Sequence, residues 1–477
     1  HIYKSSNIQR FVDGTWSANN LVDNVWGHYY EGIRAANFYL KETAGLTFDE
    51  WKYSDDYEAI MKEFTNYQYE VRFLRAYFYF ELIKRYRNIP FVLDVLAQNE
   101  ANGVNPESYE KIAKFIVDEC SDLAQILPVN YDNFSTKEKG RVTRAAAMAL
   151  KSRVTLYMAS PLFSEDSEDK WKQAAEAAYD IIKQKTDLGL DLVPYPQIFN
   201  DVNNQKAEVI LYRPTGESGD FEKANFPIGV EGGKTSTCPT QNLMEAYDMK
   251  DGTPFVWNNQ SNPYDNRDPR MKYTIVCNEM KWPVDPVEIW EGGTNGLPLQ
   301  NATTTGYYLK KYVNNTISFE AGSTVTKKQH NWVLFRYGEI LLNYAEAMIN
   351  AFHDPNYKDA VYNMSAREAV NQIRGRTNIS LPGFPSDITE KDFVKRLKNE
   401  RRVELAFEGH RFWDVRRWKE LGQTANIYGV KITKNNEVIS YEKFLLETRA
   451  VTDNMYFYPI PNTERFKNPN LGQNPGW

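Results

Sequence analysis

Residues 399–418 read NERRVELAFEGHRFWDVRRW, a stretch that joins regularly spaced acids to a run of arginines. Glu400, Glu404 and Glu408 recur at every fourth position, which places their carboxylates on one face of a helix. Like charges at this spacing repel each other and need nearby cations, so we predict a partly buried, structural network of arginine–carboxylate pairs. The residues of this structural signature are Glu400, Arg401, Arg402, Glu404, Glu408, Arg411, Asp414 and Arg417.

Paired carboxylates also raise the possibility of a glycoside hydrolase. The two catalytic acids of such an enzyme flank the scissile bond from opposite sides, about 5–5.5 Å or 6.5–9.5 Å apart. Neighbours on one helix face point in the same direction and do not satisfy this geometry. We therefore predict a protein without catalytic residues, and glycoside hydrolysis is the least favoured of the functions considered.

Other signatures of catalysis or of cofactor binding are weak. The Gly-Gly-Lys-Thr at residues 232–235 resembles the end of a phosphate-binding loop, but Ile228 stands where that loop needs its first glycine. The five histidines have no spacing typical of metal ligands. We expect no cofactor and no metal site.

Working outward from residues 399–418, apolar residues recur at helical spacing over most of the chain, but not between about residues 190 and 330. In that interval Gly, Pro, Asn and Thr are frequent, which indicates a loop-rich insertion with short strands, one of them at 208–212. The expected helices are 21–40, 57–86, 108–127, 143–159, 170–184, 334–351, 360–376 and 391–408, the last running into 413–418.

These ranges predict a mostly α fold, in which a tetratricopeptide-like scaffold of helix hairpins carries an irregular, loop-rich insertion and few short strands. We expect one compact unit made of four consecutive segments. They are an N-terminal helical scaffold at 1–190, an insertion at 191–330 that contributes to a ligand platform, a C-terminal helical scaffold at 331–425, and an extended tail at 426–477 that packs back on the scaffold.

Composition excludes some classes of function. The net charge of -6 argues against a nucleic-acid-binding surface, which is normally basic. Three widely spaced cysteines give neither a disulfide framework nor a paired metal motif. No apolar run approaches the roughly 18–20 residues that cross a bilayer. The sequence begins with His1, so we expect any signal peptide or lipid-carrying cysteine to belong to a segment that has been removed.

Several segments resemble the SusD/RagB family of Bacteroidota surface lipoproteins. From Glu400 onward the stretch is similar to that family's ERRxELAFEGxRxxDLxRW signature, with Val415 where leucine is usual. Other similar segments follow the family's order along nearly the whole chain: 72–79, 156–163, 267–270, 336–347, 458–464 and 468–477.

The resemblance implies a tetratricopeptide-like α fold and a role in nutrient uptake and polysaccharide utilization at the outer membrane. It also implies a surface-exposed lipoprotein, held by an N-terminal lipid anchor absent from this sequence, that partners a SusC-like TonB-dependent barrel. The ligand that it implies is an oligosaccharide. The RagB branch of the family implies the alternative, a peptide.

Aromatic residues in loops are the candidates for carbohydrate binding. A flat indole matches the apolar face of a sugar ring, and carboxylate or amide side chains bind its hydroxyls. Trp51 follows Asp49 in a loop between two long helices, while Trp282 and Trp290 bracket a Pro-Val-Asp-Pro segment. Each ring has the alternative reading of a partly buried packing residue. The predicted glycan-binding residues are Trp51, Trp282, Trp290, Asp49, Asp285, Trp257 and Asn258.

Overall fold

The structure, a computed structural model, describes the chain except residues 1, 4–5, 137, 166, 259–261 and 321–325. The chain divides into two compact units. The helical unit comprises residues 15–190, 416–419 and 452–477, and the mixed unit comprises 1–14, 191–415 and 420–451. This grouping differs from four consecutive segments in one unit, because the chain passes between the units several times.

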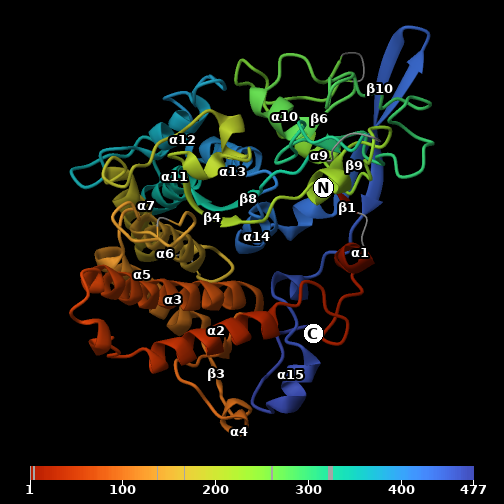
Figure 1. Cartoon of the computed structure of the whole chain (residues 1–477). Helices are drawn as coiled ribbons and strands as arrows, with labels where there is room; N and C mark the ends of the chain where they lie inside the picture. The colour runs from red at the N-terminus through yellow and green to blue at the C-terminus, as the bar shows by residue number, and fades with distance from the viewer. Residues whose placement is uncertain (1, 4–5, 137, 166, 259–261, 321–325) are drawn as a thin grey trace. The chain divides into compact units, whose positions relative to one another are not determined.

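The helical unit is built from long helices in which each packs on the next along the chain (Figure 1). Its short elements are β2 (Ile89–Pro90), which pairs with β3 (Pro106–Glu107), together with α4 (Gln98–Ala101) and α15 (Asn462–Lys467). The long helices are α2 (Trp26–Glu42), α3 (Tyr57–Tyr86), α5 (Tyr109–Ile126), α6 (Arg144–Ala159) and α7 (Glu168–Lys183).

Local sequence explains where these helices begin and how closely they pack. The hydroxyl of Ser108 accepts a hydrogen bond from the backbone N–H of Lys111, and Thr143 caps α6 in the same way. Alanines such as Ala149 and Ala178 are fully buried between α6 and its neighbours, where a small side chain permits close approach of two helices. The helix-hairpin scaffold is thus specified by caps and by small contact residues.

The mixed unit combines three packed helices with the loop-rich insertion. The helices are α11 (Tyr337–Phe352), α12 (Ala366–Arg374) and α13 (Glu390–Glu404), and the chain continues into α14 (Arg411–Arg417). The other elements of this unit are β1 (Ile2–Tyr3), α1 (Ser6–Asp13), β4 (Val209–Pro214), α8 (Asp220–Asn225), β5 (Thr237–Cys238), α9 (Gln241–Met244), α10 (Pro269–Thr274), β6 (Ile275–Val276), β7 (Tyr308–Leu309) and β8 (Asn331–Arg336).

Strand pairing ties the insertion to the helices of the same unit. Strand β4 pairs antiparallel with β8, which leads directly into α11. Residues 334–336, expected as the first turn of a helix, therefore belong to a strand. The helix expected at 360–376 begins only at Ala366, where Ser365 provides the N-cap.

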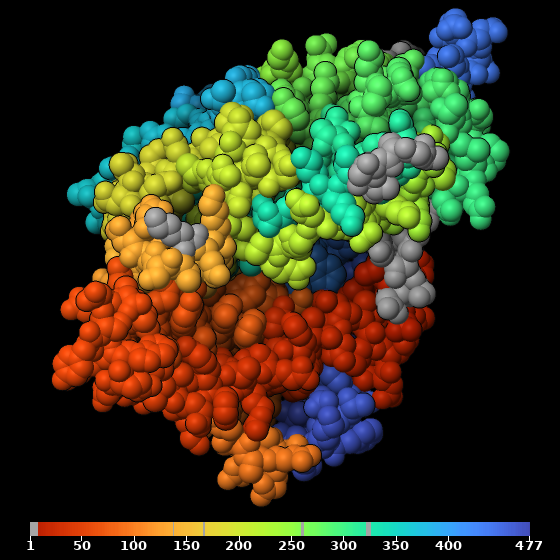
Figure 2. Space-filling view, viewed as in Figure 1, coloured from red at the N-terminus to blue at the C-terminus, as the bar shows by residue number. Residues whose placement is uncertain are grey.

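The segment after residue 425 departs most from expectation. It does not begin as an extended tail, because β9 (Asn426–Asn435) and β10 (Val438–Thr448) form a long antiparallel hairpin. Apolar residues alternate along β9, and Asn436 takes a positive φ of 54° in the two-residue turn, as such turns require. Figure 2 shows the hairpin tip, in blue, standing out beyond the green segments of the same unit.

The predicted fold class is confirmed: the chain is mostly α, with a helix-hairpin scaffold, an irregular insertion and few strands. The core of the insertion gathers buried aromatic and aliphatic side chains such as Tyr307, Tyr308 and Met271. None of the helices in the described ranges has both the length and the apolar character that a bilayer crossing needs.

Candidate functional site

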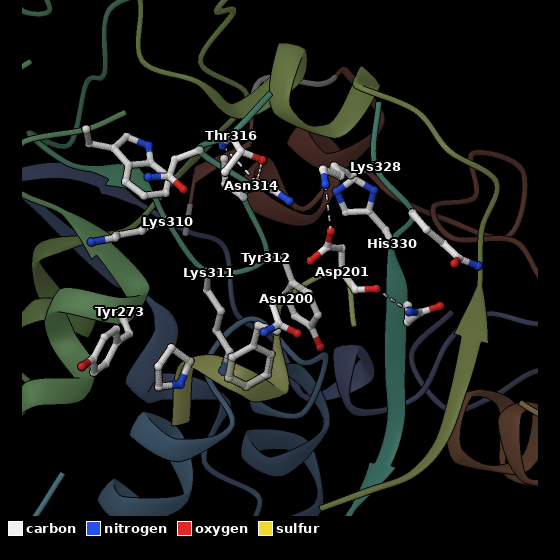
Figure 3. Close-up of a pocket in the computed structure, with 17 residues that line it drawn as sticks. Asn200, Asp201, Tyr273, Lys310, Lys311, Tyr312, Asn314, Thr316, Lys328 and His330 are labelled. Atoms are coloured by element: carbon white, nitrogen blue, oxygen red, sulfur yellow. Dashed lines mark hydrogen bonds and ion pairs between the residues drawn. The ribbon is translucent and has the colours of Figure 1, made fainter. Parts of the chain in front are cut away.

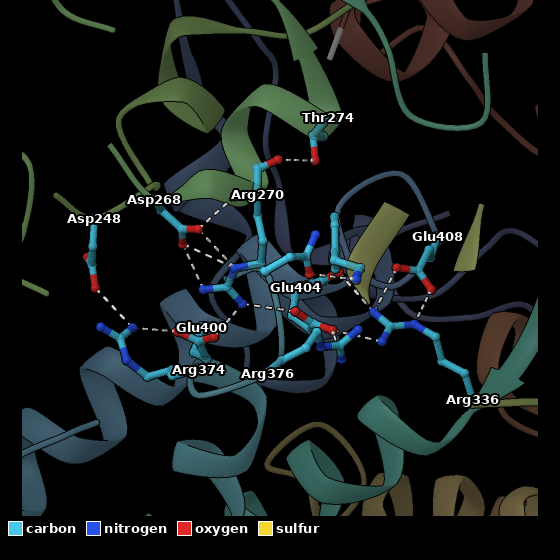
Figure 4. A network of polar contacts seen from close by, with 12 residues as sticks. Asp248, Asp268, Arg270, Thr274, Arg336, Arg374, Arg376, Glu400, Glu404 and Glu408 are labelled. Atoms are coloured by element: carbon cyan, nitrogen blue, oxygen red, sulfur yellow. Dashed lines mark hydrogen bonds and ion pairs between the residues drawn. The ribbon is translucent and has the colours of Figure 1, made fainter. Parts of the chain in front are cut away.

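The three glutamates of the signature lie in a buried network of ion pairs within the mixed unit (Figure 4). Glu404 is fully buried, and its carboxylate pairs with Arg270 at 2.9 Å and with both Arg336 and Arg376 at 2.8 Å. Arg336 also binds Glu408 at 2.7 Å. The remaining pairs of the network are Arg270 with Asp268 and Glu400, Arg374 with Glu400 and Asp248, Arg376 and Arg336 with Glu208, and Lys311 with Glu408.

The cations that neutralise these glutamates are distant in sequence, which differs from the expectation that neighbouring arginines would do so. Arg270 and Arg336 reach them from α10 and from the end of β8. Of the neighbours, Arg401 instead binds Asp414 at 2.9 Å. The physical reason is direction, because side chains one or two residues apart on a helix do not face each other.

The network keeps its acids ionised. Burial alone would raise the pKa of Glu404, but the attraction of Arg376, Arg336 and Arg270 outweighs it and holds the pKa below the ordinary value. The pKa values of Glu400 and Glu408 are lowered in the same way. A glycosidase needs one acid whose pKa is raised so that it can donate a proton. These glutamates therefore have the electrostatics of a structural network.

The insertion also encloses a cavity of about 390 Å³, here called the Trp282 cavity. Figure 3 shows Tyr273, Lys310 and Lys311 on one side of it and Lys328 and His330 on another. Asp201 and Lys328 form an ion pair of 3.3 Å at its rim. The full lining is Pro196, Phe199, Asn200, Asp201, Tyr273, Trp282, Lys310, Lys311, Tyr312, Val313, Asn314, Asn315, Thr316, Lys328, Gln329, His330 and Asn331.

The walls of this cavity mix aromatic rings with amide and hydroxyl groups. The indole of Trp282 packs into the insertion core and is only 6% exposed, and the ammonium of Lys310 lies 4.9 Å from its ring centre. Its Nε1–H is buried without an acceptor among the described residues. Tyr273 is half-buried, and its hydroxyl accepts a hydrogen bond of 3.2 Å from the Asn378 amide. Such a lining offers stacking area and directional hydrogen bonds together.

Lys311 connects this cavity to the buried network. Its ammonium donates to Glu408 at 2.8 Å and to the Tyr195 hydroxyl at 3.0 Å. Burial lowers the pKa of Lys311 to about 8, against the opposing attraction of Glu408. The cavity wall is therefore held by the same ion pairs that hold the scaffold of the mixed unit.

Of the residues predicted to bind glycan, Trp282 alone lines this cavity. Trp290 and Trp257 are half-buried and pack against the insertion core, and the Lys434 ammonium lies 4.5 Å from the Trp290 ring centre. Asp285 and Asn258 are exposed. The expected exposed rings at 282 and 290 are thus packed rings, because apolar neighbours of the insertion cover most of their area.

Trp51 and Asp49 lie in the helical unit, in a short 3-10 turn after α2. The Trp51 ring is 51% exposed and stacks on Phe48 with 5.6 Å between ring centres. Asp49 is exposed and accepts a hydrogen bond from Thr47. This turn presents a flat aromatic surface to solvent, as the sequence suggests.

Sequence reasoning did not identify Tyr273, Lys310 or Asn314 as site residues. A search for tryptophans in loops cannot find them, because Tyr273 belongs to α10 and Lys310 follows β7 directly. Their only sequence signal is position within the loop-rich insertion. No group of His, Cys, Asp and Glu suited to a metal ion occurs among the residues that the structure describes.

Comparison with known proteins places the chain in a family. Residues 198–477 match the SusD family, and residues 1–156 match a family described as starch-binding associating with outer membrane. SusD-like protein P2 of Formosa agariphila is 23% identical, over 96% of this chain and 81% of that protein.

Solved structures agree with this assignment. A SusD-like protein from Bacteroides fragilis is 26% identical, with a TM-score of 0.78 over 98% of this chain and 89% of that one. A SusD-like carbohydrate binding protein from the same species is 25% identical, with a TM-score of 0.80 over 98% and 90% of the two chains. Since the SusD match alone spans more than half of the sequence, the chain belongs to the SusD family.

Proposed function

We propose that this protein is a non-catalytic, surface-exposed glycan-binding protein that captures an oligosaccharide and delivers it to a SusC-like TonB-dependent transporter. The observation that carries the proposal is the Trp282 cavity, in which aromatic side chains adjoin a wall rich in amide and hydroxyl groups. Membership of a family that includes a SusD-like carbohydrate binding protein supports it. An outer-membrane location and an N-terminal lipid anchor belong to the same proposal.

The chemistry of the cavity suits a sugar. An oligosaccharide presents apolar ring faces and a rim of hydroxyls, which match the rings of Tyr273 and Trp282 and the polar side chains of Asn314 and its neighbours in the cavity lining. Trp51, Asp49, Trp290, Asp285, Trp257 and Asn258 remain proposed contacts outside this cavity.

We propose that the protein is not catalytic because the carboxylates near the cavity are engaged in ion pairs. Glu408, which Lys311 links to the cavity wall, is buried and neutralised by Arg336 and Lys311, and its pKa is lowered. Asp201, the acid that lines the cavity, is paired with Lys328. Incubation of the protein with its bound oligosaccharide is expected to release no new reducing ends, and the appearance of shortened products would contradict this part of the proposal.

The binding site is tested by calorimetry with an oligosaccharide selected on a glycan array. We expect a dissociation constant in the micromolar to millimolar range, because ordering costs offset most of the stacking energy. Trp282→Ala is expected to weaken binding by about tenfold or more, since one buried aromatic contact commonly carries that share of an interface. Tyr273→Phe, which removes one hydroxyl, is expected to weaken it less.

Because Trp282 is packed in the core, Trp282→Ala can also disturb folding. Trp282→Phe keeps an aromatic ring in the core and is the milder variant. Trp51→Ala tests the exposed turn, with Phe466→Ala as a matched control, since Phe466 is an exposed ring outside both candidate surfaces. Unchanged affinity in a folded Trp282→Ala and in Trp282→Phe would remove the cavity assignment. A protein that binds peptides and no glycan would contradict the proposed function itself.

A further inference from the structure

The mixed unit contains a second and larger cavity, of about 890 Å³, here called the Arg402 cavity. One wall is a basic face of α13, on which Lys391, Lys395, Lys398 and Arg402 follow one another at helical spacing. Arg411, the first residue of α14, also lines it. The family signature thus contributes two arginines to this cavity that the buried network does not use.

These two guanidinium groups make few hydrogen bonds to the rest of the protein. Arg402 donates one hydrogen bond of 2.7 Å, to the backbone oxygen of Asn242, and Arg411 donates one of 3.0 Å, to the Gln423 amide. A guanidinium carries five N–H donors, and neither group pairs with a carboxylate in the part of the chain that the structure describes. By contrast, Arg336 makes five hydrogen bonds to three glutamates.

Three of the five acids that line the cavity already form ion pairs with other cations. Glu245 pairs with Lys443 at 2.8 Å, and Glu420 pairs with Lys398 at 2.5 Å. Asp248 pairs with Arg374 at 3.1 Å. The remaining two acids, Asp387 and Asp392, are exposed at the rim. Arg402 and Arg411 are therefore left without a carboxylate in ion-pair contact among the described residues, and both line the cavity, where an anion would meet them.

The electrostatic repulsion between Arg402 and Arg411 also favours binding of an anion. Burial, together with repulsion by Arg411, lowers the pKa of Arg402 to about 9. Burial also lowers the pKa of Arg411, although Asp414 and Glu420 oppose the effect. Two half-buried cations that repel each other raise the free energy of the empty cavity, and a bound anion would relieve that repulsion.

We propose that the Arg402 cavity binds the carboxylate or sulfate group of an acidic saccharide, held between Arg402 and Arg411. The forked donors of two arginines fit planar or tetrahedral oxyanions, which they bind in bidentate fashion. The volume fits an oligosaccharide rather than an inorganic ion alone. Phe255 and Pro385 supply apolar walls for a sugar ring, and Asn399 supplies an amide for its hydroxyls.

The test uses tetragalacturonate and a chondroitin sulfate tetrasaccharide as acidic probes, with carboxyl-reduced tetragalacturonate as the neutral match. Calorimetry is expected to show that at least one acidic probe binds, and that the neutral probe binds at least about tenfold more weakly. Arg402→Met and Arg411→Met are each expected to lower affinity for the acidic probe by about tenfold or more. Arg213→Met, which removes the same charge from an exposed position outside the cavity, is the control.

Two further variants keep the test decisive if a methionine variant does not fold. Arg402→Lys keeps the charge but loses the fork, so it is expected to bind the acidic probe more weakly than the unmodified protein does. Lys395→Glu reverses an exposed charge on the same helix face and is also expected to weaken binding. Equal binding of neutral and acidic probes, unchanged affinity in the folded variants, or binding of tetraglutamate but of neither acidic saccharide would overturn the proposal.

Discussion

Replacing Arg336 with methionine is expected to lower the free energy of unfolding of the mixed unit by about 3–5 kcal/mol. Arg336 is 1% exposed, and its guanidinium pairs with Glu208, Glu404 and Glu408 at 2.7–2.8 Å. Without it, these carboxylates keep their burial and lose a shared cation. The penalty is that of uncompensated buried charge, which far exceeds the loss of one contact.

Urea unfolding of the purified protein measures this effect. Lys358→Met is the matched control in the same unit, because Lys358 forms an exposed pair with Glu368 and such pairs contribute about 0–1 kcal/mol. The double variant Arg336→Met, Glu408→Gln is expected to recover part of the loss, since it removes one of the stranded charges. If Arg336→Met unfolds at the same urea concentration as Lys358→Met, the network is not what holds the mixed unit together.

Acidification is expected to destabilise the protein steeply below about pH 5. The folded-state pKa values of Glu400, Glu404 and Glu408 lie below the ordinary value, because their arginine and lysine partners outweigh burial. In the helical unit, burial alone would raise the pKa of Glu81, but Lys84 and Arg85 lower it to about 2.

The lowered pKa values determine how stability changes with pH. A group with a lowered folded-state pKa contributes its full stability above the unfolded-state value of about 4.3 and loses it as the pH falls through the folded-state pKa. For Glu81 that window runs from about 4.3 down to about 2. Each proton taken up only on unfolding costs about 1.4 kcal/mol per pH unit.

The measurement is the urea midpoint of the unmodified protein and of Arg336→Met between about pH 7 and about pH 3. The difference in urea midpoint between the two proteins is expected to narrow as the pH falls, because a protonated, uncharged glutamate loses its ion pair with Arg336. A difference that stays constant over this range would show that the charge of the glutamates does not account for the effect of the substitution.

The helices could be predicted where local signals are complete. The helix expected at 57–86 is α3 with the same bounds, because it has an uninterrupted apolar pattern and ends before Pro90. Ser108 and Thr143 are caps that the sequence displays directly. After residue 425 the structure differs from the prediction. The alternation of β9 and the turn at Asn436 are local signals of a hairpin, whereas the prediction of an extended tail rests on the Pro- and Asn-rich sequence further on.

The site was predictable only in part. Trp282 lies in a cavity wall, but its burial depends on residues such as Lys310 that only the folded insertion brings beside it. The partners of the signature glutamates depend likewise on long-range contacts. Arg270 meets Glu400 across 130 residues of sequence, a pairing that no local pattern encodes. Helical spacing indicates which acids share a face and does not indicate what faces them.

The structure of the protein bound to an oligosaccharide selected on a glycan array tests the central claim most directly. We predict an intact oligosaccharide in the Trp282 cavity, with a sugar ring against Tyr273 or Trp282 and hydroxyls bonded to the asparagine-rich wall. A cleaved ligand, or an oligosaccharide bound elsewhere with the Trp282 cavity empty, would contradict this account.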